Sequence, residues 1–239
     1  NWKKILAAGA LTAAAAALLV GCGTDNSSQA EQKLPDKIVI GLDDNFPPMG
    51  FRDESGNLVG FDIDLAQEAS KRLGIPVEFK PIDWDSKETE LKAKIDAIWN
   101  GLSITPEREQ NILFSRPYEN GPQILLVKND SPIQGKADLA GKIVGTQQGS
   151  TGLEAIEAEP ELRDSFKELN SNSDNVTSFM MEVGRIDAVV VAQTTAAYFI
   201  KKNNAPFRII DVGYPDIPSG VGMRKGRYGT EAQLDKVLE

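Results

Sequence analysis

The chain has 239 residues, of which 41% are hydrophobic and 26% are charged, and these are ordinary values for globular domains. Its length suits one large domain or two of common size. It contains no histidine, which excludes catalytic triads and metal sites built on imidazole. The 35 acidic residues outnumber the 26 basic ones, and the resulting net charge of −9 repels phosphate backbones, so we expect no nucleic-acid partner.

The N-terminal segment has the pattern of a secretory signal. Lys3 and Lys4 precede an uncharged run of 16 residues, Ile5–Val20, which is rich in Ala and Leu and too short to span a bilayer comfortably. The run leads into Leu-Val-Gly-Cys, which resembles the bacterial lipobox and implies that Cys22, the only cysteine, is lipidated. The alternative is an ordinary signal peptide followed by a coincidental cysteine. We therefore predict a lipoprotein signal peptide over residues 1–21.

Residues 22–36 are small and polar and show no apolar period, which is typical of a flexible tether. A lipid at the start of such a tether would hold the folded part on the outer side of the cytoplasmic membrane. We expect an extracytoplasmic protein that is lipid-anchored to the cell membrane of a Gram-positive host, with a Gram-negative periplasm as the alternative.

From residue 37 onward, β-rich runs alternate with stretches of helical periodicity. Residues 62–73 place apolar side chains at helical spacing and end at Gly74, which predicts a helix. Strands are predicted over residues 37–42, 77–80 and 95–99, and a second short helix over residues 88–93. This alternation predicts α/β layers with a mainly parallel sheet.

Two short motifs recur later in the chain in the same order. Lys-Ile-Val at position 37 returns at position 142, an offset of 105 residues, and Lys-Ile-Asp-Ala-Ile at position 94 returns as Arg-Ile-Asp-Ala-Val at position 185, an offset of 91. One such match could be chance, but two in the same order indicate that both halves share a strand plan.

Two extended runs, residues 124–127 and 207–212, lie where the chain would pass between the halves. Each is followed by a polar or glycine-containing turn. Two crossings would form a hinge, and the cleft between two lobes is a common place for a ligand. We predict lobe 1 over residues 37–125 and 212–239, and lobe 2 over residues 126–211.

The loop after the first strand carries Asp43 and Phe46, at the carboxyl edge where open α/β sheets bind ligands. An aromatic ring and prolines there can form a rigid apolar wall, although Phe46 could instead belong to the core. Trp84 also follows a strand and stands between two aspartates, so we expect it to remain partly exposed and to line the cleft.

A segment after the third predicted strand combines groups that suit a carboxylate. Gly101 lets the backbone approach a ligand, Ser103 offers a hydroxyl, and Thr105 is predicted to cap a helix that begins at Pro106. Arg108 then lies about one turn into that helix, where its guanidinium can fork onto a carboxylate. The alternative is a surface arginine paired with a neighbouring glutamate.

Residues 144–152 run from a strand into a helix predicted to begin near Leu153, and backbone N–H groups at such a junction attract anions. This segment contains Gln147, Ser150 and Thr151 and would face the predicted arginine across the cleft. It lacks the motif of a phosphate-binding loop, which argues against a nucleotide. A plain tight turn is the alternative.

Five segments together resemble the polar amino acid solute-binding proteins of ABC importers, the family 3 type of extracellular and periplasmic binding proteins. They are residues 60–64, 100–108, 114–118, 148–150 and 184–190, and the resemblance extends over nearly all of residues 37–225. It implies a two-lobed, type II periplasmic-binding-protein-like α/β fold, in which each lobe is a mainly parallel sheet flanked by helices and two hinge strands join the lobes.

The resemblance also implies roles for particular residues. Arg108 and Ser103, together with amides of the loop at Ser150, would hold the α-carboxylate of a ligand. Phe46 and Trp84 would form aromatic walls. The predicted ligand-binding residues are Asp43, Phe46, Trp84, Gly101, Ser103, Arg108, Gln147, Ser150, Thr151 and Gln193.

One departure from the family pattern concerns the amino group of a ligand. The resemblance implies an aspartate directly after the strand at residues 189–191, but this position holds Ala192, followed by Gln193. An ammonium in a closed cleft needs a carboxylate partner, so we expect weak binding of α-amino acids unless Asp43 or the amide of Gln193 compensates.

The sequence thus predicts a receptor and not an enzyme. We expect a monomer without metal or cofactor that captures an amino acid or related small carboxylate by lobe closure and delivers it to an ABC transporter permease. Two alternatives stay open, a periplasmic dehydratase-like enzyme on the same scaffold and a ligand sensor that docks on a membrane receptor.

Overall fold

The computed structural model describes residues 35–172, 183–226, 235, 236 and 238, all of which belong to one compact unit, Gln32–Glu239. The predicted signal peptide over residues 1–21, the predicted lipidation site Cys22 and the tether up to residue 34 lie outside the described residues. No helix within the described part of the chain is long and apolar enough to cross a membrane.

The first sheet has five strands in the order β5-β1-β6-β14-β7. They are β1 (Ile38–Leu42), β5 (Val77–Pro81), β6 (Ala97–Ile98), β7 (Ile112–Phe114) and β14 (Gly222–Arg224). β1 lies parallel to β5 and β6, as expected, whereas β14 lies antiparallel to β6 and β7. The sheet is therefore mixed and not mainly parallel as predicted, because the returning C-terminal part of the chain adds an antiparallel strand that pairs with both β6 and β7.

The helical elements beside the first sheet are α1 (Phe61–Leu73), the 3-10 turn η1 (Trp84–Ser86), α2 (Lys87–Ala93) and the short α3 (Pro106–Glu109). α1 and α2 each begin one residue before the predicted position, α3 begins at Pro106 as predicted, and η1 was not predicted. Gly74 ends α1 in the left-handed conformation, with φ 69°. Thr105 caps α3, as predicted, because its side chain accepts a hydrogen bond from the Arg108 N–H.

The second sheet follows the order β10-β9-β11-β8-β12. Its strands are β8 (Glu119–Lys128), β9 (Ile143–Gln147), β10 (Glu168–Asn172), β11 (Ala188–Ala192) and β12 (Phe207–Ile210). β9 is parallel to β10 and β11, and β8 is antiparallel to β11 and β12. Its helical elements are η2 (Lys136–Leu139), α4 (Thr151–Glu157), α5 (Pro160–Ser165) and α7 (Gln193–Asn203).

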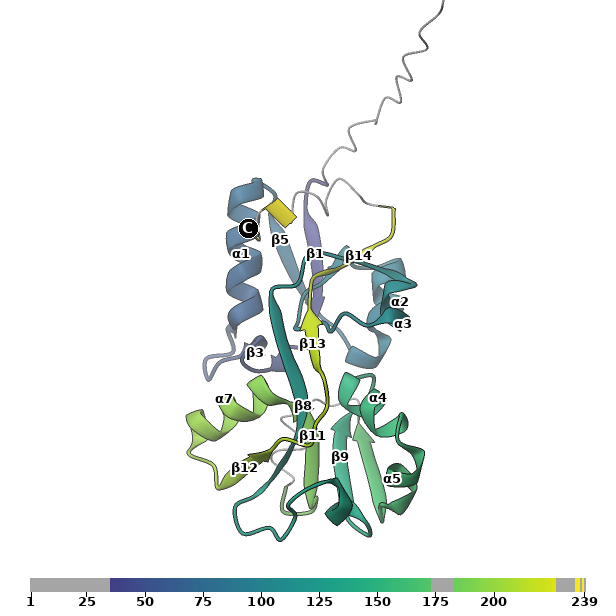
Figure 1. Cartoon of the computed structure of the whole chain (residues 1–239). Helices are drawn as coiled ribbons and strands as arrows, with labels where there is room; N and C mark the ends of the chain where they lie inside the picture. Colours follow the sequence, from purple (N-terminus) through teal and green to yellow (C-terminus); the bar gives the residue numbers. More distant parts are fainter. Residues whose placement is uncertain (1–34, 173–182, 227–234, 237, 239) are drawn as a thin grey trace, which may run out of the picture. The chain divides into compact units, whose positions relative to one another are not determined.

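β8 and β13 (Asp216–Ser219) carry the chain between the two sheets, side by side (Figure 1). The second half of β8 pairs with β11 and β12, whereas its first four residues pair with β13. After β13 the chain returns to the first sheet as β14. The chain therefore crosses twice, as expected, but the predicted places are wrong. Residues 124–127 and 207–210 pair within the second sheet, and the crossings lie at residues 119–122 and 216–219. Each sheet with its helices forms one lobe. The residues at which the lobes divide stay a prediction.

A small antiparallel sheet follows β1. It consists of β2 (Asn45–Phe46), β3 (Gly50–Arg52) and β4 (Leu58–Val59). Phe46 thus lies in a strand that pairs with β3, and Asp43 lies just before that strand.

Apolar side chains cover both faces of each sheet. In β8, Ile124 and Leu126 belong to one buried cluster, while Leu125 and Val127 belong to another. Successive residues of a strand point to opposite faces, so a strand buried on both sides shows a continuous apolar run. The first sheet is likewise packed between two clusters.

The two repeated motifs occupy equivalent places in the two sheets. In the first lobe, the Asp96 N–H donates to the Val39 carbonyl at 2.8 Å, and the Val39 N–H donates to the Asp96 carboxylate at 2.9 Å. In the second lobe, Asp187 and Ile143 exchange the same two bonds, at 2.9 and 2.8 Å. The shared strand plan is confirmed, but Val39 corresponds to Ile143, so equivalent positions lie 104 residues apart, one fewer than the 105 between the two Lys-Ile-Val motifs.

The start of α1 is held by the loop that precedes it. The first two N–H groups of the helix, those of Phe61 and Asp62, donate to loop carbonyls at 2.8 and 2.9 Å. These carbonyls belong to Pro48 and Met49. They accept the hydrogen bonds of the first helical N–H groups, because no side chain caps the helix. Gly60 permits this close approach, since its φ is 135° and a Cβ there would lie 2.4 Å from the Met49 carbonyl oxygen.

Asp62 also ties α1 to the segment that follows β6. Its carboxylate accepts a hydrogen bond from the Gly101 N–H at 2.6 Å, and the residue is 1% exposed. Burial raises the pKa of Asp62 to about 7, although the Gly101 N–H and the nearby Tyr118 hydroxyl oppose the rise. The carboxyl group is therefore protonated in the folded protein at slightly acidic pH.

Replacing Gly60 by Ala should lower the free energy of unfolding by at least about 2 kcal/mol, because the new methyl group collides with the loop carbonyl and the backbone is strained. Urea denaturation measures this change. Gly135→Ala is the matched control, since a Cβ at that position meets no atom within 4 Å. Equal stability of the two variants would contradict the role of Gly60.

The buried carboxyl of Asp62 should make stability fall as the pH rises. The unfolded chain releases this proton near the ordinary pKa of 3.8, whereas the folded chain holds it up to about 7. The stability that the protonated Asp62 contributes is therefore fully present below about pH 4 and is lost as the pH rises to about 7. The free energy of unfolding should fall by on the order of 2 to 4 kcal/mol over this range.

Asp62→Asn should remove this dependence, because an amide stays neutral and still accepts the bond from Gly101. Urea denaturation of both proteins at pH 5, 6, 7 and 8 measures the difference between their unfolding free energies. Asp64→Asn, on the exposed side of the same helical turn, is the control. A constant difference between Asp62→Asn and the unmodified protein at every pH would show that Asp62 is not the titrating group.

Candidate ligand-binding site

A cavity of about 770 Å³, partly open to solvent, is lined by residues of both lobes. All ten predicted ligand-binding residues line it, namely Asp43, Phe46, Trp84, Gly101, Ser103, Arg108, Gln147, Ser150, Thr151 and Gln193. The structure thus brings them together, and their roles in binding stay predictions.

Equivalent strands of the two lobes meet at this cavity. Asp43 follows β1, and Gln147 ends β9, the corresponding strand of the second lobe. The Gln147 Nε2 group donates to Asp43 Oδ2 at 2.9 Å. The Asp43 N–H donates to Asn100 Oδ1 at 2.9 Å, which fixes the loop against the segment after β6. The cavity therefore lies at the carboxyl ends of the parallel strands.

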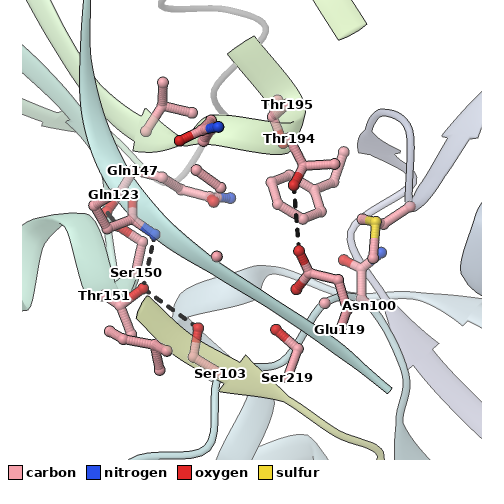
Figure 2. A pocket seen from close by; sticks show the side chains of 18 of the residues that line it. Asn100, Ser103, Glu119, Gln123, Gln147, Ser150, Thr151, Thr194, Thr195 and Ser219 are labelled. Carbon is pink, nitrogen blue, oxygen red and sulfur yellow. Dashed lines mark hydrogen bonds between the residues drawn. The ribbon is translucent and has the colours of Figure 1, made fainter. Parts of the chain in front are cut away.

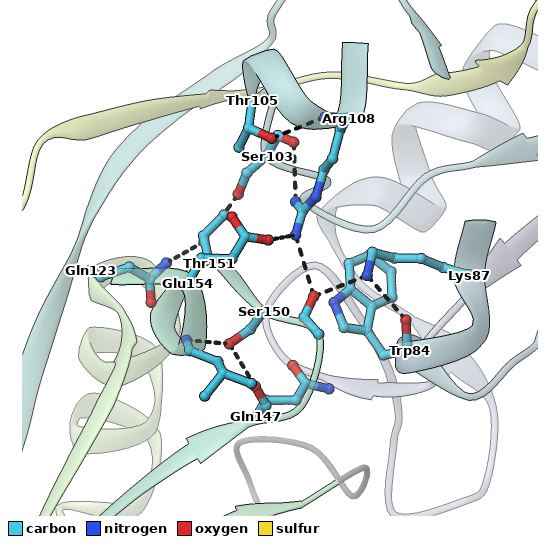
Figure 3. A network of polar contacts seen from close by, with 12 residues as sticks. Trp84, Lys87, Ser103, Thr105, Arg108, Gln123, Gln147, Ser150, Thr151 and Glu154 are labelled. Atoms are coloured by element: carbon cyan, nitrogen blue, oxygen red, sulfur yellow. Dashed lines mark hydrogen bonds and ion pairs between the residues drawn. The ribbon is translucent and has the colours of Figure 1, made fainter. Parts of the chain in front are cut away.

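Arg108 is buried, with 4% of its surface exposed, and three oxygen atoms surround its guanidinium (Figure 3). Its Nη1 donates to the Ser103 carbonyl at 3.1 Å. Its Nη2 donates to the Gly149 carbonyl at 3.3 Å and to Glu154 Oε1 at 2.8 Å. The alternative of a surface arginine paired with a neighbouring glutamate is wrong, because Arg108 is buried and its carboxylate partner, Glu154, belongs to the second lobe. The predicted position of the loop opposite Arg108 is confirmed.

A second cation, Lys87, reaches the same carbonyl. Its Nζ donates to the Gly149 carbonyl at 2.9 Å and to the Trp84 carbonyl at 3.3 Å, and it lies 5.1 Å from the centre of the indole ring (Figure 3). Burial and the neighbouring Arg108 lower the pKa of Lys87 to about 8. No sequence motif indicated Lys87, although its place three positions after Trp84 in a helical segment is typical of such a contact.

The first turn of α4 begins two residues before the predicted Leu153. Ser150 is the N-cap, and its hydroxyl accepts the Leu153 N–H at 3.2 Å while donating to the Gln147 carbonyl at 2.7 Å. Thr151 Oγ1 accepts a bond from Gln123 Nε2 at 3.1 Å and lies 3.4 Å from the Ser103 hydroxyl of the other lobe (Figure 2). These hydroxyl and amide groups offer both donors and acceptors to a ligand.

Trp84 lines the cavity, but the expectation that it is only partly buried is wrong. It is 7% exposed and packs in an apolar cluster of the first lobe with Leu91, Ile95, Ile98, Leu102 and Ile112. The flanking aspartates do not keep it in solvent, because Asp83 accepts a hydrogen bond from the Asp85 N–H and turns the chain locally. Trp84 can therefore serve both the core and the cavity wall.

Phe46 also has two environments. It is half-buried, lines the cavity, and packs against an apolar cluster of the second lobe that includes Ile124 and Leu126. The core alternative for Phe46 therefore holds in part, although the core that it joins belongs to the other lobe.

Sequence reasoning did not find several polar side chains of the cavity. They are Asn100, Glu119, Gln123, Thr194, Thr195 and Ser219 (Figure 2). Glu119 and Ser219 are paired across β8 and β13, and no local pattern predicts a pairing between residues so far apart. Among the described residues, no group of three or more cysteine, aspartate or glutamate side chains could hold a metal ion.

Residues 38–239 match the family model of bacterial extracellular solute-binding proteins, family 3. The arginine-binding extracellular protein ArtP of Bacillus subtilis is 32% identical over 243 residues, which cover 100% of this chain and 91% of that protein. The lysine/arginine/ornithine-binding periplasmic protein of Escherichia coli is 35% identical over 233 residues, which cover 94% of this chain and 88% of the relative.

A solved structure has the same architecture. It is an ABC uptake transporter substrate-binding protein from Streptococcus pneumoniae with bound histidine, and its TM-score is 0.81 at 35% identity, covering 90% of this chain and 89% of that one. The two sheets, the double crossing and the shared cavity agree with the two-lobed type II α/β fold that the sequence implied. On the match of its residues 38–239, this chain belongs to family 3 of the bacterial extracellular solute-binding proteins.

Proposed function

We propose that this protein is the solute receptor of an ABC importer and that it captures an amino acid by closing its two lobes around the cavity. One observation carries the proposal: the cavity is lined from both lobes and contains a buried arginine whose partners span them. The family consists of solute-binding proteins, which favours a receptor over a dehydratase-like enzyme and over a sensor for a membrane receptor.

Arg108 is the proposed partner of the ligand carboxylate. A guanidinium recognises a carboxylate through charge and paired hydrogen bonds, and the hydroxyls of Ser103, Ser150 and Thr151 line the same cavity. The low exposure of Arg108 strengthens this interaction, because solvent does not screen it.

The charges of the cavity favour a cationic amino acid. Its charged lining residues among those described are Asp43, Glu119 and Arg108. The positive charge of Arg108 is already balanced by its ion pair with Glu154. The remaining negative charge attracts a ligand that carries a second positive group. The curated relatives named for arginine and for lysine, arginine and ornithine support this preference.

Closure is the proposed mechanism. Contacts from the first lobe to the second connect Arg108 with Glu154, Lys87 with the Gly149 carbonyl, and Asp43 with Gln147. A ligand that touches both lobes binds the closed form better than the open one and shifts the hinge equilibrium toward it. The receptor would be a lipid-anchored monomer outside the cytoplasmic membrane. In its closed form it would deliver the ligand to a permease.

A thermal-shift panel tests the proposed function. The panel contains L-arginine, L-lysine, L-ornithine, L-histidine, L-cystine and L-glutamate. At about 100 times its dissociation constant, a ligand that binds only the folded protein adds about 2.7 kcal/mol, which should raise Tm by roughly 5 °C or more. We expect cationic amino acids to give the largest rise and glutamate the smallest. No rise with any of the six at millimolar concentration would refute the proposal.

Arg108→Ala should weaken binding of the best panel amino acid by about 2 to 5 kcal/mol, because the ligand carboxylate loses its charged partner. Arg108→Lys should also weaken binding, since an ammonium cannot form the paired contact. Isothermal titration calorimetry measures both. Arg163→Ala is the control, because Arg163 lies on α5 in an exposed pair with Asp164. An affinity of Arg108→Ala within about threefold of the unmodified protein would disprove this assignment.

A further inference from the structure

Glu119 is a cavity residue that no sequence motif indicated. It begins β8, the crossing strand, and lies opposite Ser219 of β13. The residue is half-buried and lines the cavity. Figure 2 shows its carboxylate directed toward Thr194, whose Oγ1 donates to Glu119 Oε1 at 3.2 Å.

This hydrogen bond places the Glu119 carboxylate beside the start of α7. Thr194 is the second residue of that helix, and Ala192 is its N-cap, without a side chain that could cap it. The N–H groups and the dipole of an 11-residue helix stabilise a negative charge at this end. The Glu119 carboxylate therefore lies at the N-terminal end of α7, close to Ala192, the position where the family resemblance implied an aspartate.

The charge of Glu119 is not neutralised within the described part of the protein. None of the lysine or arginine residues described there forms an ion pair with it, and the hydroxyl of Thr194 carries no charge. Of the other two charged lining residues, Arg108 is paired with Glu154, and Asp43 accepts a hydrogen bond from the uncharged Gln147 amide at the end of β9, not at the start of α7. A half-buried carboxylate of this kind favours a cationic partner from the ligand.

We propose that Glu119 binds the α-ammonium of the captured amino acid and replaces a carboxylate at position 192. This inference rests on the proposed function. The ligand would then be held between two groups of opposite charge, its carboxylate by Arg108 and its ammonium by Glu119. Because Glu119 belongs to a crossing strand, the ammonium partner comes from the hinge and not from the carboxyl end of β11. We therefore expect α-amino acids to bind well, in contrast to the weak binding expected from Ala192 alone.

Glu119→Gln tests the proposal, because the amide keeps the size of the side chain and an acceptor for Thr194 but removes the charge. Calorimetry would compare two ligands, the best amino acid of the panel and its analogue with hydrogen in place of the α-ammonium. For L-arginine this analogue is 5-guanidinopentanoate. We expect the variant to lose at least about tenfold in affinity for the amino acid and less than about threefold for the analogue.

Two results would overturn the proposal. A loss below tenfold for the amino acid would show that another group pairs with the ammonium. An equal loss for both ligands would show that Glu119 acts on the shape of the cavity or on the side chain of the ligand. Glu161→Gln, which removes an acidic charge from α5, is the matched control and should change neither affinity. If the unmodified protein binds no panel amino acid, the proposed function itself fails, which distinguishes the two failures.

A double variant provides an independent measurement. Adding Ala192→Asp to Glu119→Gln should restore affinity for the amino acid, because position 192 lines the same cavity at the same helix end. The Tm of each variant without ligand shows whether it is folded. No recovery in a folded double variant would overturn the statement that Glu119 replaces a carboxylate at position 192.

Discussion

The burial of the Arg108 guanidinium is the constraint on which the arrangement of the two lobes depends. A cation removed from water costs several kcal/mol unless oxygen atoms replace its hydration shell. The first lobe supplies the Ser103 carbonyl, and the second supplies the Gly149 carbonyl and the Glu154 carboxylate. Separation of the lobes would remove two of these three partners. Burial of this charge therefore depends on contacts from both lobes, and Lys87 of the first lobe adds a second cation to the same Gly149 carbonyl.

The internal repeat explains why the cavity lies where it does. Each lobe contains the same parallel pair, β1 with β6 and β9 with β11. In each lobe an aspartate just before the second strand forms two hydrogen bonds with the first strand. At the structural offset of 104 residues, Asp43 corresponds to Gln147, and these two side chains meet across the cavity. The carboxyl ends of two equivalent sheets thus face each other. The two side chains differ in charge, however, so the symmetric scaffold holds an asymmetric site.

Local chemistry made most of the fold and much of the site predictable. Thr105 and Pro106 define the start of α3 by capping rules, and this places Arg108 on the cavity without any long-range information. The burial of Trp84 was not predictable, because it depends on packing against residues of later strands, such as Ile98 of β6 and Ile112 of β7. Glu119 was missed for a similar reason. Its position follows from the pairing of β8 with β13, between residues about 100 positions apart.

The hydrogen-bond capacity of Arg108 limits how a ligand can use it. A guanidinium has five N–H groups, and both of those on Nη2 are directed at acceptors, the Gly149 carbonyl and Glu154. A carboxylate that binds in a paired fashion needs Nη2 together with Nη1 or Nε, so it must displace one of these acceptors. Glu154 is the easier to displace, because its side chain is 42% exposed and can return to water. In the proposed binding mode, Arg108 contributes the difference between two interaction energies, its energy with the ligand carboxylate and its energy with the Glu154 carboxylate.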